Sequence, residues 1–214
     1  MWRNVWRIGG IEIVLVSGLL LAACQPTVNN APGTPTTYND PGTPGPVQGI
    51  GIESQDIVSM TDRMMRDMLA EPRLAAQKRP PKIIIDSEYF INESADRIDK
   101  NMITDRLRVD LNRVAQGRMV FVGRHYAGMV EHERDLKRKS VVDQGTTAPT
   151  PAQMGGDYRL GGRITTLDAR NVHAGAASRY NQIVFEMVDL ESGEIVWSGI
   201  YEFTKSSRDD VVYR

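Results

Sequence analysis

The chain has 214 residues, with 26 lysines and arginines against 27 aspartates and glutamates and a formal net charge of −1. This balance excludes a general basic field of the kind that attracts nucleic acid, so no nucleic-acid partner is expected. The length allows one domain plus additional segments, and the single cysteine excludes an intramolecular disulfide.

The first 23 residues have the layout of a secretory signal peptide. Arg3 and Arg7 precede an apolar stretch over residues 13–23. That stretch has eleven residues, whereas a membrane-spanning helix needs about 20. A cleaved signal is therefore favoured over a transmembrane helix.

The end of this segment carries a lipidation signal. Leu-Ala-Ala followed by Cys24 resembles the lipobox of bacterial lipoproteins. In that family the cysteine receives a diacylglyceryl group, the signal is cut before it, and the new amine is acylated, which makes Cys24 the expected lipid anchor. Gln25 follows, and by resemblance to lipoprotein sorting rules this favours the periplasmic face of the outer membrane. Ordinary secretion with an unmodified Cys24 remains open.

Residues 24–49 are expected to hold the lipidated cysteine and a tether. Proline, threonine and glycine fill fifteen of the 25 positions from 25 to 49, and apolar residues are nearly absent. Such a segment cannot bury enough surface to offset its ordering entropy, so we expect a disordered linker. Fully stretched, it would reach about 85 Å.

A globular domain is expected over residues 50–208, followed by a tail at 209–214. A helix beginning at Ser54 carries apolar residues at helical spacing, several of them methionines, which indicate either a core stripe or a soft binding surface. A buried strand at 82–86, a polar loop, a helix at about 99–116 and a second buried strand at 119–122 follow.

The second half changes from helical to strand patterns. Residues 126–142 are predicted as a heavily charged helix, and 144–152 as a loop. Strands are expected at 158–167, 182–190 and 195–203, the last two with alternating apolar residues around a turn. The sum is one α/β domain, with a mixed sheet that ends in antiparallel strands and has flanking helices.

Tests for catalytic and metal-binding motifs are negative. His132 and Glu133 begin a zinc-protease motif, but its second histidine position holds Leu136. The glycines of residues 155–162 flank a strand and do not open a helix, which fits bulges better than phosphate binding. Asp86 and Glu88 follow a strand without a partner carboxylate, so they are expected to cap a loop. We therefore expect no enzyme and no cofactor or metal beyond the lipid.

The order of the domain's segments resembles the LpoB-type lipoproteins that activate penicillin-binding proteins. The similar stretches, which together cover nearly all of residues 49–205, are GIGIESQDIVSMTDRMMRDML, KIIIDSEYFINES, ITDRLRVDLNRVAQGRMVFVGR, GGDYRLGGRITTLDAR and the terminal strands ending in GEIVWSGIYEFTK. The resemblance implies a TolB-N-terminal-like domain. It also implies a monomeric outer-membrane lipoprotein that binds and stimulates a bifunctional penicillin-binding protein of class A. The tether is shorter than this family's enterobacterial members lead one to expect.

The resemblance does not locate the partner surface. Exposure alone makes the charged helix and the loop at 144–152 candidates, with Arg134, Lys137, Arg138 and Lys139 at the basic end of the helix. A solvated face is the alternative for this charge run. The alternative function is a structural or secretion lipoprotein related to the curli secretion channel. For that class only the hairpin at 182–203 could supply a membrane-facing row, and neither of its two rows is cleanly polar.

Overall fold

The computed structural model of the protein describes residues 36–45, 49–75, 77–147, 152–171, 173 and 175–208. The chain divides into two compact units, Met1–Tyr38 and Asn39–Arg214, and the elements described below belong to the second. The expected signal peptide, Cys24 and the tail at 209–214 lie outside the described residues, as does most of the expected tether.

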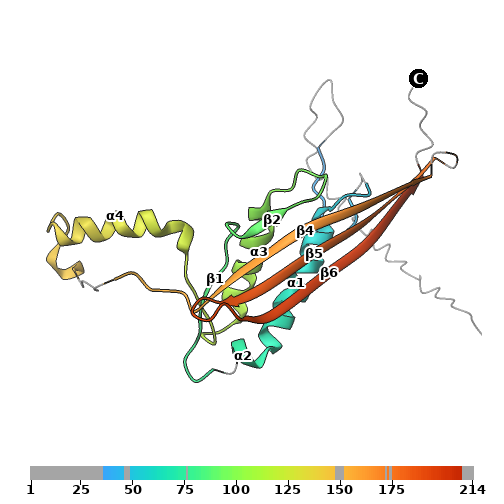
Figure 1. Ribbon diagram of the computed structural model, residues 1–214. Coiled ribbons are helices and arrows are strands. Elements are labelled where there is room, and N and C mark those ends of the chain that lie inside the picture. The colour runs from blue at the N-terminus through green and yellow to red at the C-terminus, as the bar shows by residue number, and fades with distance from the viewer. Residues whose placement is uncertain are drawn as a thin grey trace, which may run out of the picture. The chain divides into compact units, whose positions relative to one another are not determined.

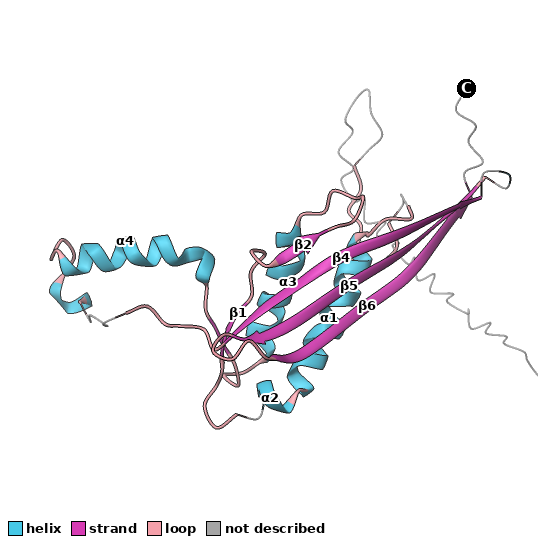
Figure 2. Ribbon diagram, in the orientation of Figure 1, coloured by secondary structure: helices cyan, strands magenta, loops and turns pink. Residues whose placement is uncertain are grey.

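One mixed six-stranded sheet forms the centre of the second unit (Figures 1 and 2). Its main order is β3-β1-β4-β5-β6, and β2 pairs with β4 off this path. Parallel pairing joins β1 to β3 and to β4, whereas β4, β5 and β6 form an antiparallel meander. The strands are β1 Lys82–Ile84, β2 Phe90–Asn92, β3 Val120–Phe121, β4 Tyr158–Asn171, β5 Ala176–Asp189 and β6 Ile195–Arg208.

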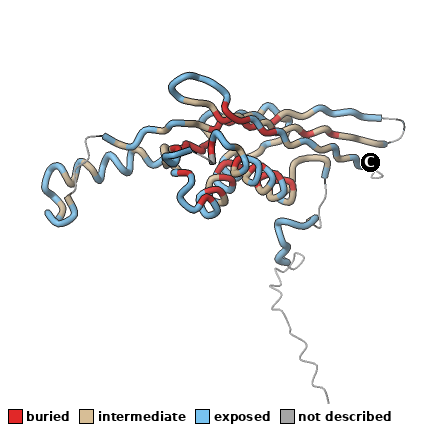
Figure 3. Tube along the Cα trace, turned by 90° about the horizontal axis from the view of Figure 1, so that it is seen from below, coloured by how far each residue is buried: buried red, intermediate tan, exposed pale blue. Residues whose placement is uncertain are grey.

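Helices α1 (Ser54–Ala70) and α3 (Lys100–Val114) pack on one face of this sheet, and the short α2 (Pro72–Ala75) follows α1 (Figure 3). The apolar spacing of α1 explains this packing, because Met60, Met64 and Met68 fall on one side of the helix and are buried. The methionine stripe is therefore core. The expected mixed sheet with flanking helices is confirmed.

The sheet contributes its alternating residues to the same core. Ile183, Phe185 and Met187 of β5 are completely buried, as the alternation predicts. Residues of the other face, such as Ile200, remain exposed. In the part of the chain that the structure describes, no helix has the length and apolarity needed to cross a membrane.

The meander strands β4, β5 and β6 are longer than the expected 158–167, 182–190 and 195–203, and two further strands differ more from the sequence-based expectations. The segment expected to be a polar loop contains β2, where Phe90 is buried and stacks on Phe185 with ring centroids 5.1 Å apart. The strand expected to be buried at 119–122 is only the two-residue β3, and of these four residues only Met119 is buried. The reason is its position, because β3 lies at the edge of the sheet.

Residues 50–56, which lead into α1, are held by side chains of the sheet, from Asn181 of β5 and Lys205 of β6. Lys205 Nζ donates to the carbonyl oxygen of Gly51 (3.0 Å) and to the Asp56 carboxylate (2.6 Å). Asn181 Nδ2 donates to the carbonyl oxygen of Ile50 (3.3 Å). These bonds, which we call the N-terminal clamp, tie residues 50–56 to β5 and β6.

Candidate partner-binding surface

Helix α4 (Ala127–Arg138) lies away from the sheet and from the other helices (Figure 1). It follows the 3₁₀ turn η1 (Arg124–Tyr126), and none of its residues is buried. The chain then passes through the 3₁₀ turn η2 (Gln144–Thr146) and returns towards β4. We call the described residues of this excursion, 124–147 and 152–155, the arm.

Three side chains hold the returning segment along α4. Arg124 Nη2 donates to the carbonyl oxygen of Met154 (3.3 Å), and Arg134 Nη1 donates to that of Ala152 (3.3 Å). Gln153 Nε2 reaches the carbonyl oxygen of Ala127 (3.4 Å). The arm is therefore held together by its own polar contacts, without a buried apolar core.

The four basic residues expected at the end of this helix have different surroundings. Arg134 is half-buried against the returning segment through its bond to Ala152. Lys137 forms an ion pair with Glu133 at 3.8 Å. Arg138 and Lys139 are exposed, and neither has an ion-pair partner among the described residues. The structure thus brings Lys137, Arg138 and Lys139 together at the outer end of α4 and turns Arg134 inward.

Sequence reasoning missed the apolar side chains of the arm. Met129 is 64% exposed, and Leu136 lies two helical turns further on, half-buried, on the same side of α4. Tyr126 at the base of the arm is 53% exposed. The signal was present in the sequence as an apolar i, i+7 pair, but the surrounding charges concealed it.

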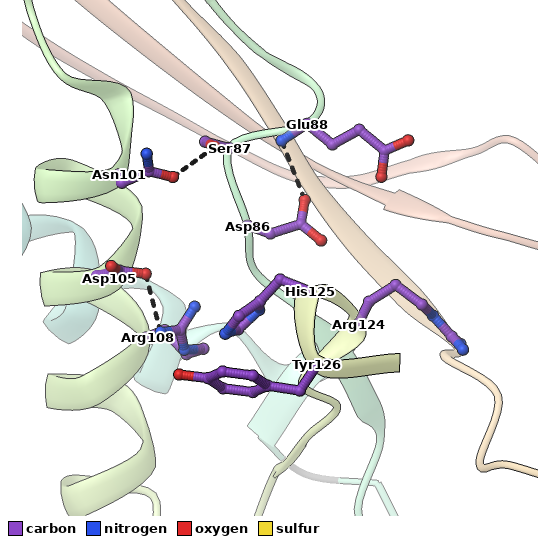
Figure 4. A pocket seen from close by; sticks show the side chains of 9 residues that line it. All are labelled: Asp86, Ser87, Glu88, Asn101, Asp105, Arg108, Arg124, His125 and Tyr126. Atoms are coloured by element: carbon purple, nitrogen blue, oxygen red, sulfur yellow. Dashed lines mark hydrogen bonds and ion pairs between the residues drawn. The ribbon is translucent and has the colours of Figure 1, made fainter. Parts of the chain in front are cut away.

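A polar cleft of about 290 Å³ opens at the base of the arm (Figure 4). It lies at the carboxyl ends of the neighbouring parallel strands β1 and β3, a common place for ligands in α/β sheets. Figure 4 shows His125 and Tyr126 on one side of the space and the side chains of α3 on another. The lining residues are Asp86, Ser87, Glu88, Asn101, Asp105, Arg108, Arg124, His125 and Tyr126.

Many polar groups of this cleft are engaged with one another or with the backbone. Arg159 binds the Asp86 carboxylate at 2.9 Å and also contacts Glu88. Asp86 accepts a bond from the backbone N–H of Glu88, so the expected loop-capping role is present. Arg108 donates to the carbonyl oxygen of Ile85 (3.1 Å) and pairs with Asp105 (2.8 Å). This arrangement fits a structural network better than a proton-transfer site, which needs a carboxylate within reach of substrate.

The remaining expected chemical residues are dispersed. His132 and Glu133 are exposed on α4, and His173 is exposed near the turn between β4 and β5. Across the described ranges no three His, Cys, Asp or Glu side chains gather in a way that could hold a metal ion.

Comparison with known proteins gives a family and distant structural likenesses. The family model described as the peptidoglycan-synthase activator LpoB matches residues 56–203. No curated protein matches. The LpoB C-terminal domain of Salmonella enterica is 17% identical, with a TM-score of 0.37, over 67% of this chain and 94% of that one. A lipoprotein of Neisseria meningitidis is 17% identical, with a TM-score of 0.31, over 62% and 88% of the two chains. The PelC dodecamer of Paraburkholderia phytofirmans is 14% identical, with a TM-score of 0.24, over 62% and 76%.

Proposed function

Because this chain belongs to the LpoB family of peptidoglycan-synthase activators, we propose that it is a non-catalytic regulator that binds and stimulates a class A, bifunctional penicillin-binding protein. It acts from the periplasmic face of the outer membrane, as a monomer. The observation that carries the proposal is the family match over residues 56–203, which includes most of α1, all of α3 and most of the sheet.

The site supports a regulatory role over a catalytic one. In the cleft at the base of the arm, the Asp86 carboxylate and the Arg108 guanidinium are held by protein partners. The arm, in contrast, presents exposed apolar and basic side chains to the solvent. Such a protein acts by contact. It raises the activity of its partner by binding the active conformation more tightly than the idle one, which shifts the population.

The location rests on the N-terminal sequence. Arg3 and Arg7, the short apolar stretch and Leu-Ala-Ala before Cys24 support lipidation of that cysteine, and Gln25 supports transfer to the outer membrane. Several acyl chains together, at about 0.8 kcal/mol per buried methylene, give a durable anchor. The residues from 25 to 49 then act as a spacer between the lipid and the domain.

The test is glycan-chain polymerisation by purified class A synthases of the same organism, with and without a fragment that begins at Gly49. We expect the fragment to bind one of these synthases and to raise its polymerisation rate, and to leave lipid II unchanged when no synthase is present. Absence of binding and of stimulation with every class A synthase of the organism would refute the proposal.

A further inference from the structure

Strand β6 forms one edge of the sheet, and no described strand pairs with its outer side (Figure 1). It has fourteen residues and pairs with β5 on its inner side. Every second residue of an edge strand directs its backbone N–H and C=O away from the sheet. In the described ranges, no backbone group of residues 197–203 bonds to any element except β5. These residues therefore offer about 23 Å of unpaired backbone.

The middle of β6 lacks the features that protect edge strands from pairing with other chains, such as prolines, bulges and inward-pointing charges. The strand contains no proline, and the register shift in its pairing with β5 lies at its start. Lys205 points inward, but it lies near the other end of the strand, in the N-terminal clamp. The charged residue of the middle, Glu202, accepts a hydrogen bond from Tyr180 of β5 (2.6 Å). Residues 197–203 are thus suited to strand addition, in which an extended segment of another protein pairs with the edge.

A hollow of about 440 Å³ lies beside this edge, between β6 and α1. Helix α1 runs along β6, since Asp56 contacts Lys205 at one end and Asp67 contacts Trp197 at the other. A segment added to β6 would therefore lie in a groove with α1 as one wall, and every second side chain of that segment would face the helix. Residues that line the hollow are Arg63, Met64 and Arg66 of α1 and Ser198, Gly199 and Ile200 of β6.

The wall formed by α1 carries positive charge. Arg63 is exposed and forms no ion pair with the described residues. Arg66 pairs with Asp62 at 2.6 Å, but both side chains are largely exposed, so water screens the pair. The nearby Asp67 carboxylate is engaged, because it accepts the indole N–H of Trp197. Guanidinium groups bind carboxylates through paired, charge-assisted hydrogen bonds. The charge of this wall is therefore complementary to acidic side chains on the added segment.

We propose that β6 and α1 form a docking groove for an extended segment of the synthase, which pairs with residues 197–203 as an additional strand. The side chains of this segment that face α1 are acidic and meet Arg63 and Arg66. Those on the other face are apolar and lie beside Ile200, which is 45% exposed. Backbone pairing supplies affinity, and the alternating side chains supply specificity. The inference rests on the proposed function. The arm follows β3, at the opposite edge of the sheet, and stays free for a second contact.

The charged wall is tested with Arg63→Glu, and Arg113→Glu on α3 is the matched control. Both side chains are exposed, and both helices pack on the same face of the sheet. Binding to the purified class A synthases of the organism is measured by surface plasmon resonance. We expect Arg63→Glu to weaken binding at least tenfold at an unchanged melting temperature, and Arg113→Glu to bind like the parent fragment that begins at Gly49. The difference should shrink at high salt, because salt screens exposed charges.

The edge itself is tested with Ile200→Lys, because a lysine on an edge strand opposes strand addition. Leu167→Lys is the control, since Leu167 is also an exposed apolar residue of the sheet but belongs to β4, away from this edge. We expect Ile200→Lys to weaken binding at least tenfold and Leu167→Lys to leave it unchanged.

Hydrogen exchange detects the added strand directly. The complex is exposed to deuterium, the reaction is quenched, and the fragment is analysed by NMR. We expect every second amide of residues 197–203 to exchange at least tenfold more slowly than in the free fragment, a pattern that contacts between side chains alone do not produce.

The outcomes separate the two proposals. If the parent fragment binds and stimulates a synthase while Arg63→Glu and Ile200→Lys bind equally well, the docking groove is wrong and the activator function stands. If the parent fragment binds no class A synthase, both proposals fail. Controls that lose as much binding as the groove variants would overturn the assignment to β6 and α1. A parent fragment that dimerises in analytical ultracentrifugation, and that Ile200→Lys makes monomeric, would identify a second copy of the chain as the occupant and overturn the synthase segment.

Discussion

Gly199 lies where α1 approaches β6, and its missing side chain lets the two elements pack closely. A Cβ atom at this position would lie 2.6 Å from Met64 Sδ and 2.6 Å from the ring of Trp197. Trp197 is itself fixed, because its indole N–H donates to the Asp67 carboxylate of α1 at 3.1 Å. The close contact between α1 and β6 therefore depends on the absence of a side chain at Gly199. The sequence alone does not show this, because a glycine in this segment could equally be a turn residue.

We expect Gly199→Ala to lower the free energy of unfolding by about 1–3 kcal/mol, because an added methyl group would overpack this contact. Urea denaturation followed by circular dichroism measures the change. Gly155→Ala serves as the control, since a Cβ there meets nothing within 4 Å, and it should stay within about 0.5 kcal/mol of the parent. Equal stability of the two variants would contradict the packing argument.

Arg179 joins two acidic residues at the far end of the sheet. Its guanidinium bonds to Asp168 (2.5 Å) and to Asp96 (2.5 Å). The bond from Arg179 holds the pKa of Asp168 below its usual value. A carboxyl whose pKa is lower in the folded state adds stability above its unfolded pKa, and this contribution disappears as the pH falls through the folded value. The ion pair of Arg179 with Asp168 therefore contributes to the stability of the folded state at neutral pH, and this contribution is lost only when acid protonates Asp168.

At the scale of elements, long periodic segments could be predicted and short paired ones could not. The helical spacing of Ile103, Leu107 and Leu111 identifies the buried face of α3, and all three are buried. Val114 continues this spacing, but it is 43% exposed because the helix ends at that residue. Strand β2 has three residues and exists because it pairs with β4, a long-range contact that no local pattern reports.

The arm shows the same limit for the candidate site. The charge pattern predicts a helix over 126–142, and α4 covers Ala127–Arg138. The pattern also marks the basic residues at its end, but it gives Arg134 the same role as its neighbours. The difference arises from a carbonyl eighteen residues later in the chain, at Ala152. Contacts of this kind depend on the path of the returning segment, and the pattern of charges along the helix does not predict that path.

Replacement of residues 124–154 by a twelve-residue Gly-Ser linker should leave the domain folded, because α4 has no buried residue. The linker must be of this length, since β3 and β4 both run parallel to β1 and the chain has to cross β1 and return along the strand direction, for which about a dozen residues or more are needed. We expect a change in melting temperature of a few degrees at most and loss of synthase stimulation. A domain that no longer unfolds cooperatively would show that the arm supports the core.

At the scale of the whole molecule, the N-terminal clamp and the arm lie at opposite ends of the sheet. The N-terminal clamp lies at the end that contains Arg179 and its register partners Asp168 and Lys205. The arm returns to the sheet at Tyr158, the opposite end of β4. From Tyr158 to Asp168 a strand covers about 33 Å at 3.2–3.4 Å per residue. The domain thus adds its own length to the reach of the tether expected over residues 25–49, which the sequence alone did not indicate.

Two variants separate attachment from reach in the cell. If the Cys24 thiol is the acylation point, as proposed, Cys24→Ala should abolish incorporation of labelled palmitate and should release the protein from outer-membrane fractions. Deletion of about fifteen residues between 25 and 49 should keep the label but impair function, whereas a scrambled sequence of the same length should remain active. Unchanged labelling of Cys24→Ala, or full function after the deletion, would contradict the anchor or the spacer respectively.

The N-terminal clamp also determines how the domain bears mechanical tension. A pull on the chain at Gly49 meets the bond from its own N–H to the Glu53 carboxylate (2.6 Å), and then the carbonyl groups of Ile50 and Gly51, which Asn181 and Lys205 hold. Lys205 also pairs with Glu53 at 3.3 Å, so part of the force passes into β5 and β6, which pair along their whole length, and not only into the first turn of α1. Without Lys205, the same pull would act directly on Asp56 and the start of that helix. A protein stretched between two moving layers of an envelope would then unwind from its N-terminus, and the clamp diverts that load into the sheet.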